Sequence, residues 1–123
     1  MRYFTTSEFD SPDKPGSGSL MSETIIEMLD DVRGKFGNPI VINSGYRTEK
    51  HNSKVGGKPK TKTSKGSSHM YGLAVDIKCD HSSDRYQLIF LLQETGFQRI
   101  GVGNTFIHVD IDFDKSQEVI WTY

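Results

Sequence analysis

The chain has 123 residues, which is the size of one compact domain, and it carries 15 Lys and Arg residues against 16 Asp and Glu residues. A net charge of −1 does not favour nucleic-acid binding, so we expect no nucleic-acid partner. The only cysteine is Cys79, which excludes a disulfide within the chain. No run approaches the ~18 apolar residues of a membrane span.

The first part of the chain predicts a loop, a helix and a short strand. The Pro, Gly and Ser residues of "SPDKPGSGS" (11–19) are typical of a loop. A helix is predicted next, with Ser22 as N-cap and Gly37 as its stop, because apolar residues recur there at three- and four-residue steps: Met21, Ile25, Met28, Leu29, Val32 and Phe36. "PIVIN" (39–43) then predicts a short buried strand.

A basic stretch follows at about residues 54–66. It carries five lysines, no acidic residue, and no large apolar residue after Val55. This composition predicts an exposed loop inside a single domain that spans residues 1–123. The loop is either a solvated, mobile connector or a segment attracted to an anionic polymer, and the sequence leaves both interpretations open.

The second half of the chain predicts strand, helix, hairpin and a closing edge segment. "LAVDIKC" (73–79) is typical of a strand, and residues 82–96 predict a helix with Ser82 or Ser83 as N-cap. "RIGVG" (99–103) and "FIHVDID" (106–112) predict a hairpin, and "QEVIWTY" adds an edge segment. The predicted class is α+β, with a few helices packed on a small, mostly antiparallel sheet.

Polar residues interrupt the apolar pattern of two of these strands. The period of two places Asp76 on the face opposite Val75, and His108 and Asp110 on the face opposite Val109. His69 lies in the turn before the first of these strands, so His69, Asp76 and His108 can converge. Two imidazoles and one carboxylate with an open fourth position form the ligand set of a catalytic zinc ion.

Spacing alone leaves a second interpretation open. His69 can be a loop histidine and His108 a strand histidine that is hydrogen-bonded within the protein. Asp76 can be the ion-pair partner of Lys78 or Arg47, because a carboxylate within an apolar strand needs a partner of some kind.

Three motifs, occurring in a fixed order, carry a resemblance to a known family. "SSHMYGLAVDI" is similar to the S-x-H-x-x-G-x-A-x-D signature of the zinc D-Ala-D-Ala carboxypeptidase and L-alanyl-D-glutamate endopeptidase family. "INSGYRTEKHN" resembles its S-G-Y-R segment, and "FIHVDID" resembles its second-histidine strand. The resemblance covers nearly the whole chain, which looks like a short phage or prophage member. The resemblance implies the hedgehog/DD-peptidase fold.

The resemblance implies a role for each matching residue. His69, Asp76 and His108 would be the ligands of one Zn²⁺ per chain. Arg47 would hold a substrate carboxylate or carbonyl, for which its planar fork of donors is suited, and Ser67 would support the site or the substrate. Tyr71, inside the signature turn, is a further candidate for substrate contact, although an exposed loop tyrosine explains it equally well.

The general base is the point at which the chain departs from the family pattern. Many members carry Glu or Asp three residues before the second histidine, where this chain has Thr105, which cannot accept a proton from water. Asp110 shares a strand face with His108 and is therefore the predicted base. The alternative is a carboxylate that supports the site without taking part in proton transfer.

These residues together predict a zinc metallopeptidase that hydrolyses peptide bonds in bacterial peptidoglycan stem peptides or cross-links. The alternative is a zinc-stabilised binding module, or a phage structural component, with the same fold. We expect a monomer. Because residues 1–14 lack an apolar segment, we also expect a protein that is made in the cytoplasm without a signal peptide. Such a protein would reach the cell wall through a lysis system or as part of a virion.

Overall fold

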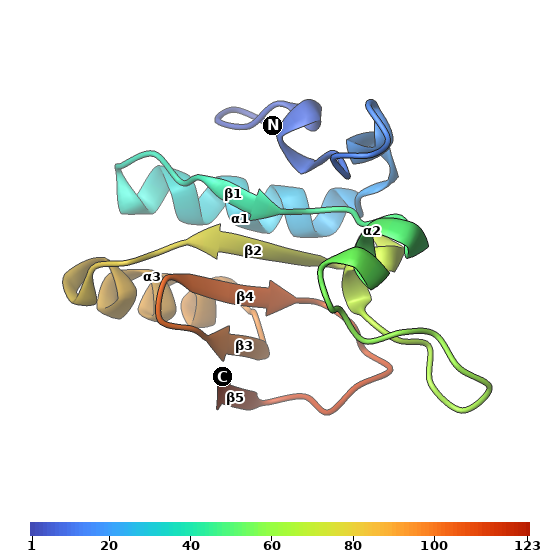
Figure 1. The fold of residues 1–123 in the computed structure, drawn as a ribbon. Coiled ribbons are helices and arrows are strands. Elements are labelled where there is room, and N and C mark those ends of the chain that lie inside the picture. Colours follow the sequence, from blue (N-terminus) through green and yellow to red (C-terminus); the bar gives the residue numbers. More distant parts are fainter.

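The computed structural model describes all 123 residues as one sheet with helices packed against it (Figure 1). Three α-helices and three short 3-10 helices accompany five strands. In chain order the elements are η1 (Thr6–Phe9), η2 (Ser17–Leu20), α1 (Glu23–Phe36), β1 (Ile42–Ser44), α2 (Glu49–Lys54), η3 (Ser68–Tyr71), β2 (Ala74–Lys78), α3 (Ser82–Thr95), β3 (Arg99–Val102), β4 (Phe106–Asp110) and β5 (Val119–Thr122).

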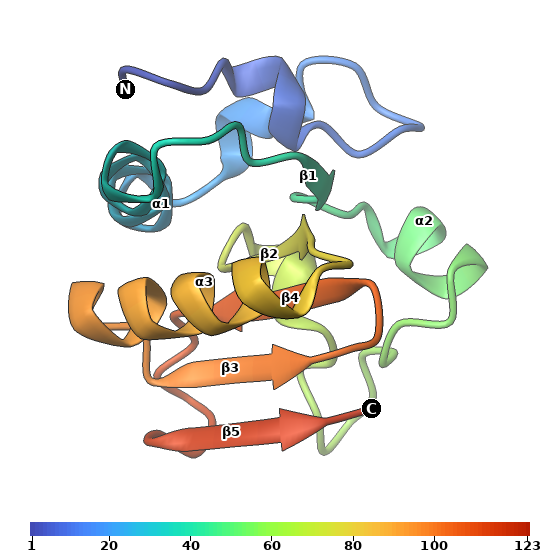
Figure 2. The same cartoon turned by 90° about the vertical axis from the view of Figure 1, so that its left-hand side faces the viewer.

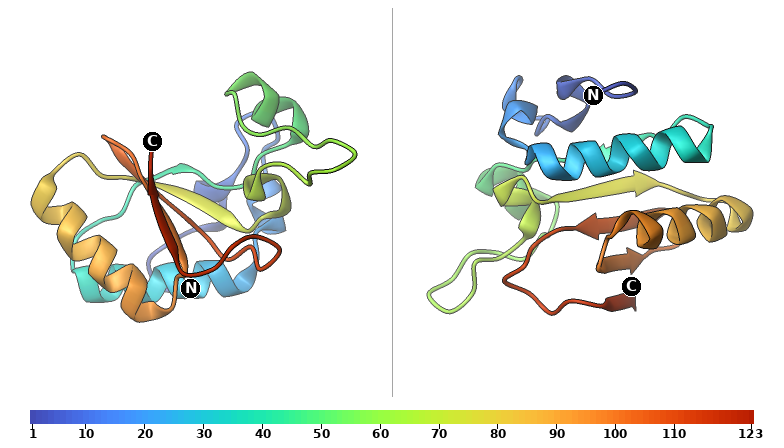
Figure 3. Two further views of the ribbon diagram at one scale, coloured as in Figure 1. Left: turned by 90° about the horizontal axis from the view of Figure 1, so that it is seen from below. Right: turned by 180° about the vertical axis from the view of Figure 1, so that it is seen from behind.

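The two long helices cover one face of the sheet and leave the other face open. Figure 2 and the rear view in Figure 3 show α1 and α3 side by side on this covered face. The core lies between them and the sheet, where Leu29 and Leu92 join Val75, Ile77 and Val109 in one buried cluster. The strand residues that alternate with these core residues therefore face the open side.

The strand order is β1-β2-β4-β3-β5, and only the β3–β5 pair is parallel. The register places one residue of every strand in a single row across the sheet. In strand order the row is Ser44, Asp76, His108, Gly101 and Trp121. The row crosses both strands that were predicted to carry metal ligands, so the topology fixes which residues can meet on the open face.

The fold confirms the predicted α+β class and most of the predicted elements. Both long helices, the β2 strand, the β3–β4 hairpin and the β5 edge strand lie where the sequence places them. The predicted N-cap of α3 was wrong, because His81 occupies that position and Ser82 is already helical. The short helix α2 was not predicted. None of the helices is long and apolar enough to cross a membrane.

Strand β1 differs from the prediction in its bounds, since it begins at Ile42 rather than Pro39 and ends at Ser44. Pro39 has no N–H to donate to a neighbouring strand, which disfavours it as a paired strand residue. The pairing with β2 is irregular between Ile42 and Ser44. This irregularity brings Ser44 opposite Asp76, next to the segment that carries Arg47.

The N-terminal segment packs directly on the end of β1, where Gly45 leaves room for it. A β-carbon at Gly45 would lie 2.8 Å from both the Cα atom and the carbonyl oxygen of Phe9. Tyr46 then donates its amide to the same carbonyl at 2.9 Å. Phe9 is itself fully buried, so the segment anchors the turn that leads to Arg47.

Candidate metal centre

His69, Asp76 and His108 meet on the open face of the sheet, as the sequence predicted. One ligand-type atom of each lies within 4.8 Å of the others. Asp76 Oδ1 is 3.3 Å from His69 Nε2 and 2.9 Å from His108 Nδ1. Tetrahedral zinc with bonds of ~2.0–2.1 Å separates its ligand atoms by about 3.3 Å. The three side chains are therefore spaced to hold one such ion.

Hydrogen bonds to the far side of each imidazole ring fix which nitrogen faces the cluster. His69 Nδ1 lies 2.8 Å from the Gly45 carbonyl oxygen, and His108 Nε2 lies 2.8 Å from Asp110 Oδ2. Each of these nitrogens must donate a proton to its oxygen acceptor. In the neutral ring, His69 Nε2 and His108 Nδ1 then present lone pairs toward Asp76. This arrangement of supported ligands is typical of protein metal sites.

Charge and burial also fit a site for a cation. Burial would raise the pKa of Asp76, but the interactions with the nearby imidazoles of His108 and His69 outweigh it and hold that pKa well below its ordinary value. Burial lowers the pKa of His69. Burial would also lower the pKa of His108, but Asp110 and Asp76 raise it above its ordinary value. Asp76 thus stays ionised and attracts a positive charge, whether a proton or a metal ion.

Arg47 approaches the cluster from the β1 side and is held by three side chains. Its Nη2 donates to Asp76 Oδ2 at 3.2 Å, its Nε to Ser44 Oγ at 3.0 Å and its Nη1 to Asn52 Oδ1 at 3.3 Å. A guanidinium has five N–H donors, so two remain for a ligand. Asp76 therefore takes part in both arrangements that the sequence left open. Its Oδ2 pairs with Arg47, and its Oδ1 faces His69 and His108.

Asp110 is almost fully buried and uses both carboxylate oxygens on protein groups. Oδ1 accepts from Arg99 Nε at 2.7 Å and from the Asp112 amide at 3.1 Å, and Oδ2 accepts from His108. Burial would raise its pKa, but His108 lowers it below its ordinary value, so the carboxylate is ionised. These contacts are those of a carboxylate that orients a histidine.

The other predicted site residues lie in different places. Ser67 lines the cleft over the cluster, and its Oγ accepts the His69 amide at 3.2 Å. Tyr71 does not line the cleft; its hydroxyl instead donates to the Lys65 carbonyl at 2.9 Å. Thr105 lies outside the cleft as well, and its carbonyl accepts the Cys79 amide.

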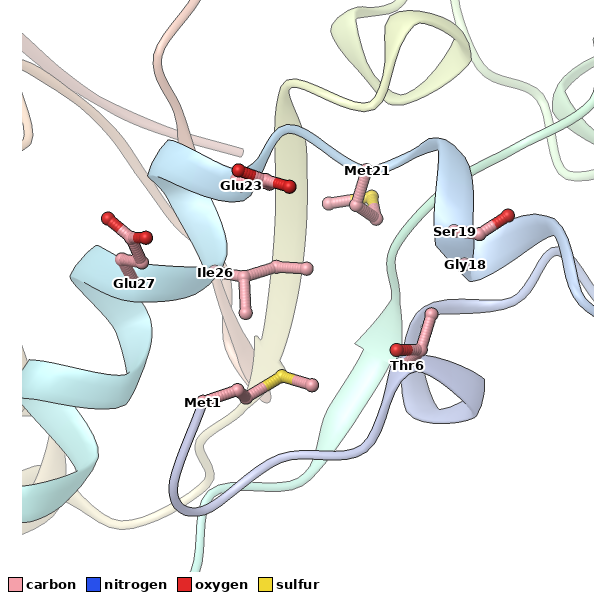
Figure 4. Close-up of a pocket in the computed structure, with 8 residues that line it drawn as sticks. All are labelled: Met1, Thr6, Gly18, Ser19, Met21, Glu23, Ile26 and Glu27. Carbon is pink, nitrogen blue, oxygen red and sulfur yellow. The ribbon is translucent and has the colours of Figure 1, made fainter.

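The cleft over the cluster has a volume of about 500 Å³ and is bounded by segments from both sheet edges. Arg47 and Gly57 line the cleft on the side of α2. Trp121 of β5 and Tyr123, the residue after β5, line it on the other side. A smaller hollow next to it is lined by Arg47, Asp76 and His51. The hollow in Figure 4 lies elsewhere, between the N-terminal segment and the start of α1, and its only charged side chains are Glu23 and Glu27.

The basic loop is exposed along most of residues 55–63, but its end is fastened to the sheet. Lys65 Nζ lies 3.0 Å from both Asp112 Oδ1 and Asp114 Oδ2. Lys115 Nζ donates to the Gly66 carbonyl at 3.0 Å and to Ser68 Oγ at 2.8 Å. Ser68 in turn donates to the buried Asp112 at 2.7 Å. This polar network holds the segment that leads into His69.

Sequence reasoning missed several residues that support the cluster. Asn52 is 1% exposed, and its amide connects Arg47 to the Lys58 carbonyl. Gly45 supplies the carbonyl that orients His69 from 24 residues earlier in the chain. No spacing signal could have found the Gly45 contact, because it depends on the fold. The Asn52 contact with Arg47 depends on α2, which the sequence did not predict.

The fold and the cluster together define a small α+β domain with a candidate metal centre, whose two histidines and one aspartate are a donor set that catalytic zinc sites use. A family model described as Peptidase M15 matches residues 2–110, and the chain therefore belongs to the peptidase M15 family. This confirms the resemblance to the zinc D-Ala-D-Ala carboxypeptidase family and makes the protein a member of a family of metallopeptidases, which typically use zinc. A search of curated proteins found no match to the chain.

Proposed function

We propose that the protein is a zinc peptidase that cleaves peptide bonds in bacterial peptidoglycan, either in stem peptides or in their cross-links. The observation that carries this proposal is the pair of oriented imidazoles facing one ionised carboxylate, in a cleft that Arg47 also lines. Family membership supports peptidase activity, and the substrate is our inference from the motifs.

His69 Nε2, Asp76 Oδ1 and His108 Nδ1 would hold the zinc ion. When bound there, zinc would polarise the scissile carbonyl and lower the pKa of a bound water toward ~7. Asp76 keeps its other oxygen on Arg47, so the metal ligand and the substrate-binding arginine are held in one fixed geometry. Asn52 and Ser44 position the same guanidinium from two further sides.

Arg47 would bind the substrate through its two remaining N–H donors. A planar pair of donors suits a terminal carboxylate or a peptide carbonyl that gains negative charge during the reaction. Ser67 would add a hydrogen bond from its hydroxyl, which accepts the His69 amide and still has its proton to donate. Both residues line the cleft.

Cleavage would also need a general base among the chain's own groups. The base role of Asp110 stays a prediction, and its three protein contacts support the alternative task of orienting His108. The same contacts, together with Thr105 at the usual acidic position, favour a second candidate function. In that case the domain is a zinc-stabilised binding or virion module that does not cleave peptides.

Digestion of purified peptidoglycan by the zinc-loaded protein tests the proposal. We expect soluble peptides, and mass spectrometry of their new ends identifies the bond that is cut. His69→Ala serves as the control for metal-dependent cleavage. If the zinc-loaded protein binds peptidoglycan but releases no peptide, the non-catalytic module is the correct reading.

A further inference from the structure

The cleft has a second wall that the family match does not cover. The match ends at residue 110, whereas β5 and the residue that follows it occupy positions 119–123. Trp121 and Tyr123 of this segment both line the cleft over His69, Asp76 and His108. The sequence predicted no site residue on this wall.

Sheet register places Trp121 beside the cluster of His69, Asp76 and His108. Trp121 pairs with Gly101, which in turn pairs with His108. Because Gly101 has no side chain, the indole can lie across it; a β-carbon there would come within 2.7 Å of the ring. The indole ring centre is then 5.6 Å from that of His108. The guanidinium carbon of Arg99 lies 4.9 Å from the indole centre, on a side chain that is itself bound to Asp110.

Tyr123 continues this wall and presents a hydroxyl group to the cleft. Its ring centre lies 4.9 Å from that of Phe106, the first residue of the strand that carries His108. Partial burial of the phenol group raises its pKa, and Asp76 and Asp110 raise it further, whereas Trp121 and Arg47 lower it. The phenol is therefore un-ionised at neutral pH and lies within electrostatic range of both sides of the cluster.

Most other polar groups of the cleft are already used by the protein. Lys115 donates to the Gly66 carbonyl and Ser68, and Arg99 donates to Asp110 and the Ser116 carbonyl. The Tyr123 hydroxyl donates to no protein acceptor, and the residue is 71% exposed. Its proton is thus free for a ligand in the cleft, as are the two remaining donors of Arg47.

We propose that Tyr123 is a substrate-binding residue whose hydroxyl donates a hydrogen bond to an oxygen of the ligand at the metal centre, with Trp121 as the wall that positions it. This inference rests on the proposed function, because it assumes that the cleft receives a peptide at a bound metal ion. The ligand would lie between Arg47 on one side and Tyr123 on the other. Both groups donate hydrogen bonds, which suits a substrate that presents carbonyl or carboxylate oxygens.

Acetohydroxamate, a small oxygen ligand for zinc, is the probe that tests Tyr123 without requiring catalysis. Trp121 is the only tryptophan, so its fluorescence reports ligand binding at the cleft directly. Tyr123→Phe should weaken acetohydroxamate binding to the zinc-loaded protein by about 10- to 100-fold, the effect of losing one hydrogen bond to a charged oxygen. Zinc content and melting temperature should not change, which separates a lost contact from a lost structure.

Tyr86→Phe is the matched control, because it removes the same hydroxyl from an exposed tyrosine on α3, which covers the opposite face of the sheet. It should bind acetohydroxamate as the wild type does. If the proposed function is also correct, Tyr123→Phe should lower kcat/KM on peptidoglycan fragments by a similar factor, with Tyr86→Phe unchanged.

The two proposals fail in different ways. Equal acetohydroxamate affinity in wild type and Tyr123→Phe would overturn the role of Tyr123, whatever the activity on peptidoglycan. A wild type that binds acetohydroxamate but digests no peptidoglycan would overturn the proposed function, while the affinity ratio would still decide the role of Tyr123.

Discussion

Asp110 shows at the scale of one residue how a sequence pattern and a structure can assign different tasks to the same carboxylate. Strand alternation correctly placed Asp110 on the face that carries His108. It could not show that Arg99, the Asp112 amide and His108 all donate to this carboxylate. His108 and the Asp112 amide are each two residues away along the chain, whereas Arg99 comes from β3. The Arg99 contact depends on the β3–β4 register, which the sequence pattern did not predict.

Asp110→Asn distinguishes the two tasks. An amide has one acceptor oxygen where the carboxylate has two, so it cannot serve all three donors, and the orientation of His108 should be lost. We expect zinc affinity to fall by about 10- to 100-fold, which is the usual cost of removing such a support. Competition against a chelator of known affinity measures this change.

The opposite pattern of results would restore the base role of Asp110. In that case Asp110→Asn would bind zinc as the wild type does and lose about 10²- to 10⁴-fold in turnover. Thr105→Ala is the control for both readings, because Thr105 is exposed and lies outside the cleft. It should match the wild type in zinc affinity and in turnover within a few-fold.

At the scale of elements, the sequence located the long helices and the hairpin because their apolar periods are strong. It did not find α2, a six-residue helix without an apolar face, whose only buried residue is Asn52. It also could not show that the end of the basic loop is fastened to the segment after β4. Those contacts join Lys65 and Ser68 to Asp112, 44 or more residues later, and only the fold brings them together.

Asp112→Asn tests whether this polar network supports the fold. Asp112 is 1% exposed, and its carboxylate binds Ser68 and Lys65. Removing its charge leaves Lys65 and the nearby Lys115 without their common buried partner. We expect a loss of about 2–4 kcal/mol in the free energy of unfolding at pH 7, measured by urea unfolding of the metal-free protein.

The effect of Asp112→Asn should depend on pH in a defined direction. Burial would raise the pKa of Asp112, but hydrogen bonds from Ser68 and Lys65 lower it below the ordinary value. The stabilisation is therefore fully present above the unfolded pKa of ~3.9 and is lost as pH falls through the folded value. The difference between wild type and variant should shrink below about pH 4. Asp114→Asn, at an exposed partner of Lys65, should cost no more than ~1 kcal/mol.

The exposed part of the basic loop carries a separate prediction. Lys54, Lys60 and Lys62 form no ion pair in the structure, and the loop extends away from the domain in Figure 1. If the loop is attracted to anionic wall polymer, changing these three lysines to Gln should weaken wall binding at low salt. Since charges are screened over ~8 Å at physiological ionic strength, the wild type should also release from walls as salt rises.

A control variant with the same change in net charge separates the effect of the loop's position from the effect of overall charge. The triple change of Lys14, Lys35 and Lys78 to Gln removes the same charge from other parts of the surface. Sedimentation of both variants with purified walls compares them directly. If the two triple variants bind equally well, the loop is only a connector and the attraction reflects overall charge.

At the scale of the whole molecule, the alternation of β2 and β4 and the turn before β2 indicated that His69, Asp76 and His108 can converge, and the structure brings them together. The second wall of the cleft could not be predicted, because β5 had been recognised only as an edge segment. Its parallel pairing with β3 is what brings Trp121 into the row of His108. An edge strand has a side chain period but no sequence signal for its partner or register.

The metal ion would connect parts of the chain that are far apart in sequence, and this gives the last prediction. Its ligands come from η3, β2 and β4, and their supports come from Gly45 and Asp110. Zinc that binds only the folded form at 100 times its dissociation constant stabilises that form by about 2.7 kcal/mol. For a domain of this size, chelation should therefore lower the melting temperature by roughly 10 °C, as measured by calorimetry with and without a chelator. Metal analysis should find one equivalent of zinc in the wild type and almost none after His69→Ala and His108→Ala are combined. The double variant should then melt at the same temperature with and without zinc, because it lacks the site through which the ion acts. Full zinc retention in this variant would show that another group of side chains holds the metal and would remove the basis of the proposed peptidase centre.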